Sequence, residues 1–207
     1  MKIIMASYEI LTPIDREEIL KNIELAGRTC YRSFDRITEG SASKFVRKLV
    51  GLQHESVLEH QSLTVKFICD RGIMAELTRH RLASFSVEST RYCNYSSDKF
   101  GNELTVIDPM FNNWSKHHMW KEACKVAEIH YFGLLEMGVA PEMARSVLPS
   151  STKTEVVMTA NMREWRTVLK QRTSLAAHPQ MRELMVPLLA ELHSLLPELF
   201  DDIMRIK

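Results

Sequence analysis

Residues 63–81 read LTVKFICDRGIMAELTRHR, and this stretch carries the two signals that decide the fold. Leu63, Val65 and Phe67 alternate with polar side chains, which is the period of a β-strand with one buried face. Arg71-Gly72 interrupts the run, and a short helix from Ile73 to about His80 is expected to follow. A strand that passes directly into a helix predicts a fold in which both kinds of element are mixed.

Helical and extended periods alternate along the rest of the chain. We expect a first strand at residues 3–5, and a first helix that begins at Thr12-Pro13 and ends at Gly27. The other predicted elements are strands at 103–107 and 152–159, helices at 41–49, 120–134, 141–147 and 162–171, and a last helix from Pro179 into the 190s, with Pro187 as a possible kink. Because strands and helices are interspersed, we predict one mixed α+β domain over residues 1–207.

The composition is that of an ordinary globular protein, with 45% hydrophobic and 26% charged residues. The 27 basic and 26 acidic side chains leave a net charge of +1, so any anion site has to be a local cluster. No stretch approaches the ~18 apolar residues of a membrane span, and the four cysteines are scattered. These features predict a cytoplasmic protein with reduced thiols and with neither a membrane nor a nucleic-acid partner.

A basic cluster follows the predicted short helix. It consists of Arg79-His80-Arg81 and, after it, Ser84, Ser86, Glu88, Ser89 and Arg91. The planar fork of arginine matches phosphate oxygens, and Ser89 and Arg91 would share a face of extended chain. A solvated basic helix end, favoured by the helix dipole, explains the same spacing equally well.

A second polar segment, His54-Glu55-Ser56-Val57-Leu58-Glu59-His60, holds two histidines and two glutamates. Its histidines are six residues apart, whereas two zinc ligands on one helix face are four apart. A metal site is therefore the minority interpretation, and we predict none.

Together these motifs resemble the flavin-dependent thymidylate synthases. Their signature of Arg-His-Arg, seven residues and Ser is complete from Arg79 to Ser89, and residues 54–60 are similar to the H-E-[ST]-x-x-E-H segment of that family. The resemblance implies a central, largely antiparallel sheet flanked by helices. It also implies that dUMP is converted to dTMP, with 5,10-methylenetetrahydrofolate as carbon donor and NADPH as reductant through bound FAD, in a homotetramer with shared active sites.

The resemblance also implies roles for particular residues. Flavin contacts are implied for His54, Ser56, Glu59, Arg79, His80, Arg81, Glu88, Asn161, Arg163 and His178. Substrate contacts are implied for Glu76, Arg79, Glu88, Ser89, Thr90, Arg91, Arg145 and Arg172. Arg172 is the expected catalytic residue, because an arginine held at the pyrimidine would favour ionisation at N3 and stays protonated itself.

Three residues depart from the family pattern: Glu76 in place of Gln, Thr167 in place of Asn and Cys30 in place of Ser. None of the four cysteines precedes a histidine, so a thiolate nucleophile has no candidate and the flavin would carry the hydride chemistry. Two other function classes stay open: a nucleotide- or RNA-binding module that uses the basic clusters, and a metal-dependent hydrolase that uses His54 and His60.

Overall fold

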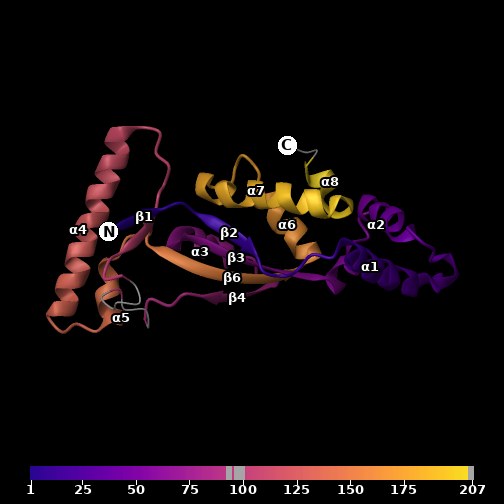
Figure 1. The fold of residues 1–207 in the computed structure, drawn as a ribbon, viewed down its shortest axis with the longest axis horizontal. Coiled ribbons are helices and arrows are strands. Elements are labelled where there is room, and N and C mark those ends of the chain that lie inside the picture. Colours follow the sequence, from indigo (N-terminus) through magenta and orange to yellow (C-terminus); the bar gives the residue numbers. More distant parts are fainter. Residues whose placement is uncertain (92–94, 96–100, 205–207) are drawn as a thin grey trace. The chain divides into compact units, whose positions relative to one another are not determined.

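A computed structural model describes residues 1–91, 95 and 101–204 (Figure 1). Contacts within the chain divide it into two compact units. The first unit comprises residues 1–7, 67–79 and 85–157, and the second comprises residues 8–66, 80–84 and 158–207.

The strands form two sheets. They are β1 (Lys2–Ile4), β2 (Ser7–Ile10), β3 (Ser62–Asp70), β4 (Ala83–Val87), β5 (Thr105–Ile107) and β6 (Lys153–Asn161). Four of them form one sheet in the order β2-β3-β6-β4, while β1 pairs in parallel with β5. The predicted α+β class with a largely antiparallel sheet flanked by helices is confirmed. The strand expected at residues 63–67 is the centre of β3, whereas β2 and β4 were not predicted as strands.

Helices make up most of the remaining structure. The α-helices are α1 (Arg16–Tyr31), α2 (Ser41–Gly51), α3 (Arg71–Leu77), α4 (Trp114–Glu136), α5 (Pro141–Ala144), α6 (Met162–Arg172), α7 (Pro179–Leu195) and α8 (Pro197–Met204). The 3-10 turns are η1 (Phe34–Arg36), η2 (Glu55–His60) and η4 (Arg145–Val147). The helix predicted from Pro179 into the 190s is α7, which continues through Pro187 and ends at Leu195. The helix α8 that follows it was not predicted.

The first helix begins later than predicted. Its N-cap is Asp15, whose carboxylate accepts a hydrogen bond from the Glu18 N–H at 3.0 Å. The Thr12 hydroxyl accepts instead from the Thr64 N–H at 2.9 Å. Because Thr12 serves β3 and not a helix, the prediction of a helix start at Thr12-Pro13 is wrong.

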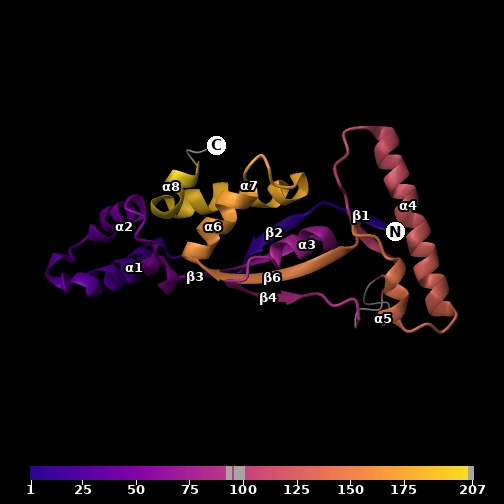
Figure 2. The same cartoon turned by 180° about the vertical axis from the view of Figure 1, so that it is seen from behind.

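The first helix also runs past Gly27, so the predicted end there is wrong. A Cβ at Gly27 would lie 2.7 Å from Cε1 of Phe45 and 3.0 Å from Cδ1 of Leu49, both on α2. This glycine therefore serves close packing of α1 on α2, which lie side by side in Figures 1 and 2. The helix ends at Arg32, which takes the left-handed conformation with φ of 49°.

In the first unit, α4 covers the β1–β5 pair. Its buried face presents Cys124 and Tyr131, which pack in one cluster with Leu104, Val106 and Ala144. Figure 2 shows α4 as a long helix beside β1 and α5. Through Ala144, this cluster packs α5 against α4. Arg145 follows directly as the first residue of η4.

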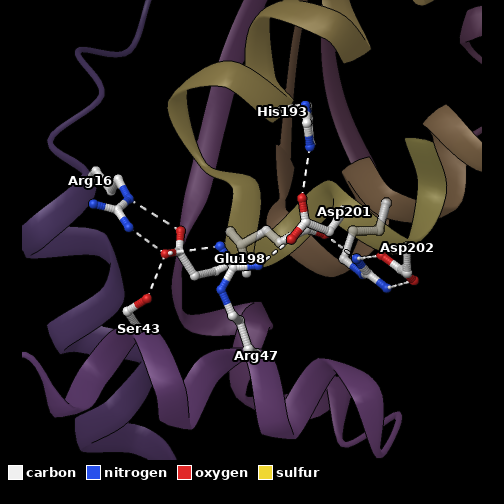
Figure 3. Close-up of polar contacts among 9 residues, drawn as sticks. Arg16, Ser43, Arg47, His193, Glu198, Asp201 and Asp202 are labelled. Carbon is white, nitrogen blue, oxygen red and sulfur yellow. Dashed lines mark hydrogen bonds and ion pairs between the residues drawn. The ribbon is translucent and has the colours of Figure 1, made fainter. Parts of the chain in front are cut away.

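In the second unit, α8 is attached to its neighbours by ion pairs (Figure 3). Three carboxylates of α8 bind four basic side chains. Glu198 binds Arg16, Asp201 binds both Arg47 and His193, and Asp202 binds Arg166. The Ser43 hydroxyl adds a hydrogen bond to Glu198 at 2.6 Å. These partners come from α1, α2, α6 and α7, so α8 joins four helices of this unit.

Candidate active site

A pocket of 420 Å³ opens in the second unit where α1, η2 and α6 meet. Three residues with implied flavin contacts line it: His54, Ser56 and Arg163. The other lining residues are Gly27, Cys30, Tyr31, Leu49, Gln53, Glu55 and Val57. The volume lies within the roughly 300–1,000 Å³ of ligand pockets, and the exposed Tyr31 ring and the Arg163 cation suit a flat, phosphate-bearing ligand. The residues present therefore fit part of a flavin nucleotide.

Two more of the implied flavin residues lie next to this pocket, and each has a partner of its own. The Arg163 guanidinium binds the Glu59 carboxylate. Asn161 is the N-cap of α6, and its side-chain oxygen accepts from the Glu164 N–H at 2.9 Å. Glu59 thus orients Arg163, and Asn161 caps the helix that carries it.

Arg166, which the sequence did not single out, binds Glu55, one of the residues that line the pocket of the second unit. Its guanidinium is 1% exposed and lies 2.9 Å from the Glu55 carboxylate of η2 and 2.8 Å from Asp202 of α8. Burial opposes the charged form, but the hydrogen bonds and charges of Asp202 and Glu55 raise the pKa of Arg166. A buried arginine shared by two carboxylates fixes η2, and with it His54 and Ser56.

The histidine of the basic cluster meets the expected catalytic arginine. Arg172 Nε donates to His80 Nε2 at 3.0 Å, and His80 is 7% exposed. Burial and then the positive charge of Arg172 lower the pKa of His80. His80 is therefore held neutral at pH 7, with Nε2 as the accepting nitrogen.

A second pocket of 420 Å³ lies in the first unit, and it contains two of the implied substrate residues. Arg145 and the buried Thr90 are joined by a hydrogen bond of 3.0 Å from Nη1 to Oγ1. The rest of the lining is Arg71, Ser146, Leu148, Pro149 and Ser150. Two guanidinium groups among several hydroxyls provide the donors that a phosphate monoester requires.

Near this pocket, Glu88 is bound to a lysine that the sequence did not indicate. Lys153 Nζ lies 2.8 Å from Glu88 and 2.6 Å from Glu155. Burial opposes the charged form of Lys153, yet the two carboxylates raise its pKa. Glu88 therefore has a fixed cationic partner, and its oxygens suit an acceptor for a ring N–H or a ribose hydroxyl.

Ser89 and Arg91, on either side of Thr90, do not lie in extended chain as expected. Strand β4 ends at Val87, and the Ser89 hydroxyl accepts from the Arg91 N–H at 3.3 Å. Arg91 Nε lies 4.0 Å from the Glu142 carboxylate of α5. Ser89 and Arg91 thus form a turn, and the expectation that they share a strand face is wrong.

The remaining implied residues are spread over both units. Glu76 and Arg79 belong to the first unit, near the end of α3, and Arg79 is exposed. Arg81 and His178 are exposed residues of the second unit, where His178 is the N-cap of α7. The structure joins His80 to Arg172, Glu59 to Arg163 and Thr90 to Arg145, but it shows no contact that ties Arg81 or His178 to those pairs among the described residues.

The cysteines that the structure describes lack thiolate character where they are buried. Burial raises the pKa of Cys69 to about 12, and burial also raises the pKa of Cys124. Cys93 lies outside the described residues. Among residues 1–91, 95 and 101–204, no three His, Cys, Asp or Glu side chains form a group that could hold a metal ion. No helix in the same part of the chain is both long and apolar enough to cross a membrane.

Two solved structures share this fold. Thymidylate Synthase X from Helicobacter pylori, solved with FAD and dUMP, has a TM-score of 0.75 and 25% sequence identity, and the match covers 96% of this chain and 99% of that one. The UMP/dUMP methylase PolB from Streptomyces cacaoi, bound with 5-Br dUMP, has a TM-score of 0.79 over 99% and 97% of the two chains, and at 23% identity it shows the fold alone. The fold class is thus the ThyX-type α+β fold.

The sequence matches agree with the fold. The family described as thymidylate synthase complementing protein (Thy1) matches residues 14–198. The probable flavin-dependent thymidylate synthase of Mycobacterium phage L5 is 35% identical over 191 residues, which cover 87% of this chain and 79% of the relative. The flavin-dependent thymidylate synthase of Pyrococcus furiosus is 29% identical over 167 residues, or 80% and 68% of the two chains. The chain belongs to the Thy1 family, and the resemblance found in its sequence is confirmed.

Proposed function

We propose that this chain is a flavin-dependent thymidylate synthase, which methylates dUMP to dTMP with 5,10-methylenetetrahydrofolate as carbon donor and NADPH as reductant. The observation that carries the proposal is the match to the FAD- and dUMP-bound Thymidylate Synthase X over 96% of this chain. The two pockets support it, because each gathers residues of one implied ligand and not of the other. Residues 1–207 would act as one catalytic domain.

The pocket of the second unit would hold the flavin. His54 and Ser56 line it, Arg163 offers a cation, and Glu59 and Asn161 hold that arginine and its helix. Arg79, His80, Arg81, Glu88 and His178 complete the proposed flavin set. When bound, FAD supplies the hydride chemistry for which the chain has no side chain of its own.

The pocket of the first unit would hold the phosphate of the nucleotide. Arg145 is oriented there by Thr90, and Arg71 adds a second guanidinium. Ser89, Arg91, Glu76 and Glu88 would contact the rest of the nucleotide. Ser89 would be a positioning group, because its hydroxyl accepts from the Arg91 N–H and, among the residues that the structure describes, no base is seen bound to it.

Arg172 would hold the pyrimidine of dUMP. Its Nε is bound to the neutral His80, which orients the guanidinium without cancelling its charge. A fixed positive charge beside N3 and its carbonyl neighbours favours the anionic form of the ring. Arginine stabilises that anion while it stays protonated itself, so a group other than Arg172 would accept the proton that leaves the ring.

We also propose that the enzyme is a cytoplasmic homotetramer whose active sites take residues from more than one chain. A chain of 207 residues offers little surface on which to enclose FAD, dUMP and a folate together. Symmetric assembly lets one chain supply part of the binding site of another.

The visible spectrum of the purified protein tests the flavin. We expect an absorbance band near about 450 nm, as for flavins in general. The same protein should form dTMP from dUMP when methylenetetrahydrofolate and NADPH are added. Protein that is colourless, and that stays so after incubation with FAD, would contradict the proposal and favour the nucleotide-binding module.

Arg172→Ala tests the role of the arginine at the pyrimidine. We expect the variant to keep its flavin spectrum but to form dTMP about 10²–10³ times more slowly, since one fixed charge at the reacting ring is lost. Gln171→Ala, a change at the exposed neighbouring position on α6, is the control and should leave turnover unchanged. Full turnover by Arg172→Ala would refute the assignment.

A further inference from the structure

Glu164 is a buried acid beside the residues of the proposed site. Its side chain is 9% exposed, and burial raises the pKa of its carboxyl group. A buried carboxyl group is costly without a partner, and such groups therefore have specific contacts. Glu164 Oε1 lies 3.5 Å from Nδ1 of His80, which is itself buried.

The position of Glu164 in its helix makes this contact notable. Glu164 is the third residue of α6 after the N-cap Asn161 and donates its own N–H to that asparagine at 2.9 Å. A glutamate at this position commonly turns back to the N-cap N–H and completes a capping box. Here its carboxylate faces His80 instead, so helix capping alone does not account for the direction of the side chain.

The hydrogen bond on the other side of the ring decides the tautomer of His80. A guanidinium N–H only donates, so the Arg172 Nε–H contact at 3.0 Å requires that His80 Nε2 accepts. The single proton of a neutral imidazole then sits on Nδ1, the nitrogen that faces Glu164. The three side chains form a directed series in which Arg172 donates to His80 Nε2 and the Nδ1 side of His80 faces the Glu164 carboxylate at 3.5 Å.

A carboxylate at the far nitrogen of a histidine does two things. It holds the ring in one orientation and one tautomer, and it makes the opposite nitrogen a better acceptor. That nitrogen is the one that fixes Nε of Arg172, at the last residue of α6. A long arginine side chain has many rotamers, so a fixed Nε determines the plane of its guanidinium.

We propose that Glu164 is a positioning residue that acts through His80 to orient Arg172 for the pyrimidine of dUMP. The proposal rests on the proposed function, because it takes the role of Arg172 from there. Nothing in the resemblance of the sequence assigns a role to Glu164. The contact that reveals it joins α6 to His80, three residues after the end of α3 and 84 positions earlier in the chain.

Three variants of the FAD-loaded protein test the proposal. Glu164→Ala removes the carboxylate that faces His80, and Glu164→Gln keeps an oxygen there without the charge. Glu18→Ala is the matched control, because Glu18 also occupies the third position after an Asx N-cap, on α1, but is exposed. All three should be compared by their thermal unfolding before activity is interpreted.

The first readout is the ring of His80 by ¹⁵N NMR, with the signal assigned by its loss in His80→Gln. We expect protonated Nδ1 and unprotonated Nε2 in the wild type, in Glu164→Gln and in Glu18→Ala. Glu164→Ala should show a mixture with the Nε2–H form, in which the bond from Arg172 is lost. A wild-type ring protonated on Nε2, or a Glu164→Ala ring like the wild type, would overturn the proposal.

The second readout is turnover. We expect Glu164→Ala to lower kcat for dTMP formation about tenfold with a smaller change in KM, by analogy with the loss of an outer partner of a ligating histidine. Glu164→Gln should recover most of that loss, and Glu18→Ala should show none. Equal losses in Glu164→Ala and Glu18→Ala would assign the effect to helix capping and refute positioning. If the wild type forms no dTMP, the proposed function fails, whereas the NMR comparison still decides whether Glu164 fixes His80.

Discussion

At the scale of single residues, Arg71 shows how a side chain proposed for the site can lie outside every sequence motif. In the sequence, Arg71-Gly72 only marks the end of a strand. In the structure, Arg71 begins α3, its N–H donates to the Ser150 carbonyl at 3.0 Å, and its side chain lines the pocket of Arg145 and Thr90. Glu164, Lys153 and Arg166 were missed for the same reason, because each becomes informative only beside its partner.

The Arg71→Ala variant tests whether the two arginines share one anion. We expect the KM for dUMP to rise about tenfold, equivalent to ~1.4 kcal/mol, because one of two guanidinium contacts to the phosphate is lost. Turnover at saturating dUMP should fall much less. Lys116→Ala, at an exposed cation on α4 in the same unit, is the control. An unchanged KM in Arg71→Ala beside a raised KM in Arg145→Ala would show that Arg145 acts without it.

At the scale of elements, α8 is held by charge as well as by apolar contact. Leu199, Phe200 and Ile203 are buried in the second unit, and Glu198 is buried with them, at 2% exposure. Although burial opposes ionisation, hydrogen bonds from Arg16 and Ser43 lower the pKa of Glu198. The Glu55–Arg166–Asp202 contacts connect this helix to η2, which lines the proposed flavin pocket.

Glu198→Gln tests the contribution of that attachment. We expect the free energy of unfolding at pH 7 to fall by about 2–3 kcal/mol, because Arg16 and the buried amide then lack a charged partner. Arg16 is half-exposed, so water recovers part of the loss. Glu17→Gln, which breaks an exposed pair with Lys21, is the control and should cost far less than Glu198→Gln.

The lowered pKa of Glu198 also predicts how the stability difference between wild type and Glu198→Gln depends on pH. A carboxyl group with a lowered pKa in the folded state stabilises the fold above its unfolded pKa of about 4.3, and that stabilisation is lost as the pH falls through the folded pKa. The difference in unfolding free energy between wild type and Glu198→Gln should therefore narrow below about pH 4.3. A constant difference from pH 7 to pH 3 would show that the charge of Glu198 is not the cause.

At the scale of the whole molecule, the pocket proposed for the nucleotide phosphate and the pocket proposed for the flavin belong to different compact units of the chain. A homotetramer with shared sites could combine the pocket of one chain with the pocket of another. Arg145 in the first unit and Arg172 in the second are the residues that test this.

Mixing two impaired variants, assayed at a dUMP concentration well below the KM of Arg145→Ala, measures the sharing directly. Arg145→Ala and Arg172→Ala, unfolded and refolded together, should regain about a quarter of wild-type turnover if a site takes the two arginines from different chains, since random pairing leaves that share of sites intact. Each variant refolded alone is the control. A mixture no more active than its components would show that one chain supplies both arginines.

What the sequence determined by itself was local. Three relations between near neighbours are carried by chain order alone: the alternation from Leu63 to Phe67, the helical spacing of residues 162–171, and the signature from Arg79 to Ser89. They sufficed for the α+β class, for most of the elements and for the family. They failed at Gly27, where packing on α2 and not backbone freedom explains the glycine.

Only the tertiary structure decided which side chains meet. Arg172 and His80 are 92 residues apart, Arg145 and Thr90 are 55 apart, and Arg166 and Asp202 are 36 apart. Burial made these contacts specific, because a polar group removed from water has to find a partner within the fold. That requirement depends on the packing of whole elements, which no local pattern records, and it is the physical reason that Glu164 emerged from the structure and not from the sequence.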